Sequence, residues 1–191
     1  MSWLDSRSGS EVTRRASPRD LAFSGLFGAA ALLLPVLFHL LHLGRVFMPM
    51  YLPLCTLPFF VGPRPAAVTA LLVPLLSGAV TGMPPFYPPV AVFMAIELAG
   101  MAAIISAVVR CWPQANEWLV LIPVLLFGRV LYVALVYGFS LVIALPAEFM
   151  ATLSFVGGWP GIVLMVVVVP PIARARRRTT RHAGAGAGSE R

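Results

Sequence analysis

Long apolar stretches constrain this chain more than any other feature of its sequence. Hydrophobic residues make up 59% of the 191 residues and charged residues only 11%, whereas about a quarter of the residues in a typical soluble domain are charged. A soluble domain of this length cannot bury so much apolar surface in one core, whereas a bilayer can accommodate it. Because a membrane-spanning helix takes about 20 apolar residues, the chain holds at most about seven spans. The composition therefore argues against a soluble globular enzyme and leaves no room for a separate soluble domain.

Six apolar segments predict an all-α integral membrane protein with six transmembrane helices. They cover residues 21–43, 47–61, 66–80, 90–109, 119–139 and 151–173. The second and third would reach only about 22 Å as helices, against a hydrocarbon core of about 30 Å. Pro49, Pro53 and Pro58 interrupt the second segment, and Pro74 interrupts the third. We therefore expect these two helices to be short and proline-broken.

Broken helices at membrane depth are tolerated where they pack against protein or line a wet cavity. The two short segments thus indicate an internal pocket, although two merely kinked helices would fit the same pattern. Residues 1–20 form a polar N-terminal tail, residues 21–173 the membrane domain, and residues 174–191 a basic, Gly/Ala-rich tail that we expect to be disordered.

The arginines predict the orientation of these six spans. Twelve of the 14 basic residues fall on the side of the two tails, so the positive-inside rule places both termini in the cytoplasm. Their position in tails and short loops favours contact with anionic lipid over binding of nucleic acid. All 14 are arginines, which excludes a lysine-containing phosphate loop and any Schiff-base lysine. Cys55 and Cys111 are too few and too far apart for a disulfide framework or a zinc pattern, and we expect neither a metal nor a cofactor.

Ionisable residues inside the membrane are costly and are therefore candidates for function. Glu97 lies about 10 Å deep in the fourth segment and Arg129 about 15 Å deep in the fifth, counted at 1.5 Å per residue. The two residues are thus within one helical turn of the same level. They could form a buried ion pair, or they could face a polar ligand together. We predict that Arg129→Ala abolishes ligand binding while the protein still inserts and folds.

Four further polar residues lie near the predicted outer ends of the segments. His39 and His42 share one helix face, with Arg45 just beyond them, and Glu148 precedes the sixth segment. The histidines could contact a ligand or could simply lie at the interface. A metal site would need a third ligand, which the spacing does not supply.

The first segment also contains two overlapping pairs of small residues, Ser24 with Gly28 and Gly25 with Ala29. Pairs at this spacing let helices approach closely in lipid. They could pack within this chain or against a partner subunit.

Several motifs resemble the substrate-binding subunits (S components) of energy-coupling factor (ECF) transporters. They are Pro74-Leu75-Leu76-Ser77, Thr81-Gly82-Met83-Pro84-Pro85, Met94-Ala95-Ile96-Glu97-Leu98, Gly128-Arg129 and the run from Gly158-Trp159-Pro160-Gly161-Ile162 to Pro170. The resemblance covers roughly residues 24–172. It implies a six-helix protein of the prokaryotic plasma membrane that binds a vitamin or related micronutrient in an outward-facing pocket and has no ATPase motif of its own.

The resemblance also implies partners and site residues. A transmembrane coupling subunit and two ATPases would drive uptake, with Gly25 and Ala29 at the coupling surface. Loops 42–47 and 81–89, the second of which contains Met83, would close over the ligand. A pocket with Arg129, His39 and Glu97 suits a pantothenate-like carboxylate first and a heterocyclic vitamin second.

Two alternatives from other classes remain open. One is an intramembrane enzyme using Ser77, His39 or Glu97, although the sequence has neither a GxSxG nor an HExxH motif. The other is a structural membrane subunit without a small ligand, whose polar residues merely pair with one another.

Overall fold

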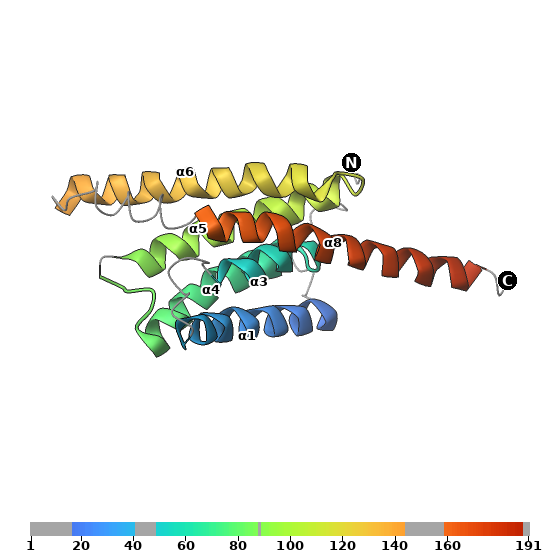
Figure 1. The fold of residues 1–191 in the computed structure, drawn as a ribbon, viewed down its shortest axis with the longest axis horizontal. Coiled ribbons are helices and arrows are strands. Elements are labelled where there is room, and N and C mark those ends of the chain that lie inside the picture. The colour runs from blue at the N-terminus through green and yellow to red at the C-terminus, as the bar shows by residue number, and fades with distance from the viewer. Residues whose placement is uncertain (1–16, 41–48, 88, 144–158, 189–191) are drawn as a thin grey trace, which may run out of the picture.

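The computed structural model describes residues 17–40, 49–87, 89–143 and 159–188, and within these ranges it consists of helices joined by short turns (Figure 1). The elements in chain order are α1 (Pro18–Leu40), α3 (Tyr51–Thr56), the 3₁₀ helix η1 (Leu57–Phe59), α4 (Pro63–Thr81), α5 (Val90–Cys111), α6 (Glu117–Ile143) and α8 (Trp159–Gly188). Helices α4 and α5 form the most extensive contact, α6 packs on α5, and α1 packs on α4.

Four of these helices are long and apolar enough to cross a membrane: Pro18–Phe38, Pro63–Thr81, Val90–Cys111 and Glu117–Leu141. Large apolar side chains on them point away from the bundle, among them Leu33, Val80, Leu119, Val130 and Leu141, which are between 67% and 81% exposed. Such an exterior suits a lipid environment and indicates a membrane protein. Helix α8 contributes only a shorter apolar stretch, Pro160–Ala175.

Helix α1 begins at Pro18, three residues before the predicted start of the first segment. Proline is favoured at the first position of a helix because its missing N–H would have no partner there. Asp20 lies in the first turn, where a carboxylate interacts favourably with the helix dipole. Two charged residues assigned to the polar tail, Arg19 and Asp20, therefore belong to the first helix.

The second segment is short and broken, as predicted. Helix α3 has six residues, and the chain then tightens into η1 at Pro58. These elements contact α1, α4 and α5, and α3 also contacts α8. Tyr51, Leu54, Cys55 and Leu57 are buried. The irregular backbone is therefore surrounded by protein, as membrane depth requires.

The prediction of a short, broken third helix is wrong. Helix α4 is continuous over 19 residues, with Pro74 inside it. Its additional length comes from Thr81 at the end and from Pro63, Arg64 and Pro65 at the start, which the apolar pattern left out although prolines are well tolerated in a first helical turn. Pro74 lies inside the helix without ending it, and its ring is fully buried in the bundle; prolines are tolerated within membrane helices that pack against other helices.

The structure of the C-terminal segment also differs from the prediction. The composition predicted a disordered tail from residue 174, whereas α8 continues to Gly188 and extends past the ends of the other helices (Figure 1). Alanine and arginine are strong helix formers, so a helix that packing has already nucleated can propagate into this stretch.

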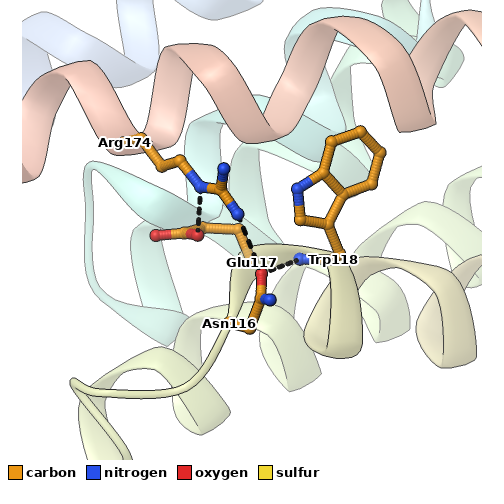
Figure 2. A network of polar contacts seen from close by, with 4 residues as sticks. All are labelled: Asn116, Glu117, Trp118 and Arg174. Atoms are coloured by element: carbon orange, nitrogen blue, oxygen red, sulfur yellow. Dashed lines mark hydrogen bonds and ion pairs between the residues drawn. The ribbon is translucent and has the colours of Figure 1, made fainter.

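A polar network attaches α8 to the start of α6 (Figure 2). Arg174 Nε donates to Glu117 Oε2 at 3.0 Å, and Arg174 Nη2 donates to Asn116 Oδ1 at 3.1 Å. The same Asn116 oxygen accepts the backbone N–H of Trp118 at 3.2 Å. Glu117 is buried, so the contact fixes α8 at this end of the bundle.

Candidate functional site

Helices α5 and α6 approach each other closely at Gly128. A Cβ added at this glycine would overlap Met101 Sδ and would lie 3.1 Å from Glu97 Oε1. Met101 and Glu97 are one turn apart on α5, so together they form the surface that α6 covers. The absence of a side chain at residue 128 is what lets α6 approach Glu97.

Three polar side chains meet at this approach: Tyr51 from α3, Glu97 from α5 and Arg129 from α6. The Tyr51 hydroxyl donates to Glu97 Oε2 at 2.5 Å. The Arg129 guanidinium carbon lies 5.2 Å from the centroid of the Tyr51 ring, within cation–π distance. Arg129 also interacts electrostatically with Glu97. The structure thus brings together the two residues whose depths the sequence matched, and we call Tyr51, Glu97 and Arg129 the polar cluster.

The polar cluster is buried within apolar protein. Glu97 is 1% exposed, Tyr51 2% and Arg129 7%. Glu97 Oε1 has no hydrogen-bond partner among the described residues. A buried oxygen without a partner costs free energy, and it is an acceptor to which a donor group of a ligand could bind.

Tyr51 is the member of the cluster that the sequence reasoning missed. A signal was available, because a buried tyrosine hydroxyl usually needs a hydrogen-bond partner and Tyr51 lies within a proline-rich apolar segment. Its partner, however, is 46 residues away in the chain.

A second polar arrangement closes the C-terminal end of α4. Ser77 Oγ donates to the Met83 carbonyl at 2.7 Å, and Thr81 Oγ1 donates to the Ser77 carbonyl at 2.8 Å. Gly82 ends the helix with φ of +72°, a left-handed conformation that favours glycine. The loop that contains Met83 is therefore held against the helix that precedes it.

A pocket of about 340 Å³ lies between this loop and α1. It is lined by Leu32, Pro35, Val36, Ser77, Thr81 and Met83. Met83 lines this pocket, whereas Glu97 and Arg129 do not. In this conformation the two charged residues face Tyr51 rather than the pocket.

Gly78→Ala is expected to displace the Met83 loop. A Cβ there would lie 2.7 Å from the Pro84 carbonyl oxygen and 3.0 Å from the Phe86 ring, and backbone cannot yield as a side-chain end can. Limited proteolysis within residues 82–87 should become at least several-fold faster. Gly25→Ala, where a Cβ meets nothing within 4 Å, is the control. Equal proteolysis of both variants would contradict the close approach.

The two pairs of small residues in α1 point in different directions. A Cβ at Gly28 would lie 3.5 Å from Thr69 Cγ2 of α4, so Gly28 and the half-buried Ser24 face the bundle. Gly25 and Ala29 are exposed. One pair therefore serves packing within the chain, and the other remains available to a partner.

The structure does not place the side chains of the remaining predicted site residues. His39 lies near the end of α1, and His42, Arg45 and Glu148 lie outside the described residues. Among the described residues, no three His, Cys, Asp or Glu side chains lie close enough together to hold a metal ion.

Comparison with known proteins gives no match: no protein-family model, no curated protein and no solved structure is significantly similar to this chain.

Proposed function

We propose that this chain is the substrate-binding subunit of an ECF-type transporter that takes up a small vitamin-like solute across a prokaryotic plasma membrane. In this proposal the chain spans the membrane six times with both termini in the cytoplasm, and a coupling subunit and two ATPases supply the energy. The observation that carries it is the polar cluster, in which a carboxylate with one unpartnered oxygen and a guanidinium lie inside an apolar bundle. Ionisable groups so placed are usually retained for function.

The arrangement suits a ligand with an anionic group and a hydrogen-bond donor. Arg129 would bind the anion, and Glu97 Oε1 would accept from the donor. The 340 Å³ pocket beside Met83 is of a size suited to small organic molecules. In the proposed topology it opens outward, and movement of the Met83 loop would connect it with the cluster. The exposed Gly25 and Ala29 would face the coupling subunit.

An enzymatic role for Ser77 has less support. Its hydroxyl donates to the Met83 carbonyl at 2.7 Å, which fixes the loop rather than activating a nucleophile. A structural subunit is the second candidate, and one observation favours it: the three residues of the cluster contact one another and are almost completely buried.

Thermal stability of the purified full-length protein in detergent tests the proposal. A ligand that binds only the folded state, at a concentration 100 times its Kd, raises the free energy of unfolding by about 2.7 kcal/mol. We expect such a shift with one member of a panel that includes pantothenate, thiamine and their precursors, and we expect co-purification with a coupling subunit and two ATPases. Stabilisation by none of the panel, together with no such co-purification, would favour the structural subunit.

A further inference from the structure

A second pocket lies at the opposite end of the bundle from Met83. It has a volume of about 280 Å³ and is lined by Pro58, Phe59, Phe60, Val61, Val109 and Arg110. These residues come from η1, from the loop that follows it and from the last turns of α5. Since α5 is one of the helices long enough to cross a membrane, the pocket lies where that helix reaches the interface between lipid and water.

Arg110 provides the positive charge of this pocket. Its guanidinium lies directly against Gly62, where an added Cβ would be 2.8 Å from Nη2. Among the described residues, no carboxylate forms an ion pair with Arg110; the ion pair found there joins Arg174 to Glu117. The guanidinium thus occupies a defined position with capacity to bind an anion.

The side chains of the other lining residues are apolar, and Phe60 is firmly packed. The Phe60 ring lies 5.3 Å from the rings of both Phe23 and Phe27, centroid to centroid. Arg19 adds a second cation next to this aromatic group, 5.6 Å from the Phe23 centroid. Ser106 donates to the Val61 carbonyl at 2.7 Å and so holds the loop above α5. A ligand that fits here has an anionic head and an apolar body.

We propose that this pocket binds the headgroup of an anionic phospholipid, such as phosphatidylglycerol, from the leaflet at this end of the bundle. The phosphate would accept hydrogen bonds from Arg110, and the glycerol and upper acyl chain would lie along Phe59 and Phe60. Basic pockets between membrane helices bind anionic headgroups in this way. A soluble anion would gain nothing from the aromatic wall. The site is separate from the polar cluster and does not depend on the transport proposal.

Native mass spectrometry of the full-length protein tests this assignment, with phosphatidylglycerol and phosphatidylcholine titrated separately. The test variant is Arg110→Gln. The matched control is Arg64→Gln, because Arg64 is an exposed arginine at the same end of the bundle that does not line the pocket. We expect Arg110→Gln to bind phosphatidylglycerol about tenfold more weakly, as loss of a charged hydrogen bond implies, and Arg64→Gln to bind it as the wild type does.

Three results would overturn the assignment. Unchanged phosphatidylglycerol binding by Arg110→Gln would exclude this arginine. Equal weakening by both substitutions would indicate general surface electrostatics rather than a pocket. Displacement of the lipid by soluble glycerol phosphate at similar concentrations would assign the pocket to a free anion. A wild type that retains phosphatidylglycerol over phosphatidylcholine, with the loss confined to Arg110→Gln, supports it.

Discussion

Gly128→Leu is expected to destabilise the folded protein by at least about 3 kcal/mol, near the upper end for overpacking of a core. An added Cβ alone would overlap Met101 Sδ, and Met101 is buried and cannot move aside freely. The larger side chain would force α6 away from α5 and would separate Arg129 from Glu97. Because the damage falls on the polar cluster, we expect ligand binding to be lost together with stability.

Gly138→Leu is the control for this substitution. Gly138 lies in the same helix, is exposed, and a Cβ there would meet nothing within 4 Å. This variant should retain the wild-type midpoint of unfolding, measured by titration with denaturing detergent. Equal loss of stability in both variants would mean that α5 and α6 do not approach at Gly128.

Arg129→Met is expected to cost about 3–5 kcal/mol, because it leaves a buried carboxylate without its compensating charge. Combining it with Glu97→Gln should restore most of that loss, since the pair is then neutral and the glutamine oxygen can still accept from the Tyr51 hydroxyl. The free energy of unfolding of both single variants and the double variant gives the coupling between the two residues. A double variant as unstable as the sum of the single variants would show that they do not act as a pair.

The same double variant separates the two candidate functions. If the cluster exists to bind a ligand, the variant folds stably but no ligand stabilises it and it supports no uptake. If the cluster only joins α3, α5 and α6, the stable double variant retains whatever activity the wild type has. A folded protein that still bound ligand normally would remove Arg129 and Glu97 from the binding site.

The cluster was only partly predictable from the sequence. The shared depth of Glu97 and Arg129 follows from counting residues along two apolar helices, because helical rise is constant, and the structure brings the two together. Tyr51 did not follow from such counting. Its helix α3 is too short to span, so its depth depends on how the neighbouring helices hold it.

The third helix was mispredicted for a similar reason: its course depends on neighbouring helices as well as on the local sequence. The apolar run placed the start of the segment at residue 66, although Pro63 and Pro65 suit a helix start. Whether Pro74 breaks a helix depends on the packing around its ring, and that is a property of the bundle rather than of the local sequence. Likewise, the pairs Ser24–Gly28 and Gly25–Ala29 have the same spacing in the sequence. Only the position of α4 determines that the first pair faces the bundle.

By itself, the sequence determined that this is a helical chain suited to a membrane, that it contains very few buried charges, and that Glu97 and Arg129 lie at one level. Those properties depend on composition and on the fixed geometry of a helix. Tertiary structure alone decided that Tyr51 joins the two, that Met83 and Arg110 line separate pockets, and that Gly128 permits the contact between α5 and α6. The physical reason is that such contacts join residues far apart in the chain, and close packing selects them only when all the helices are in place.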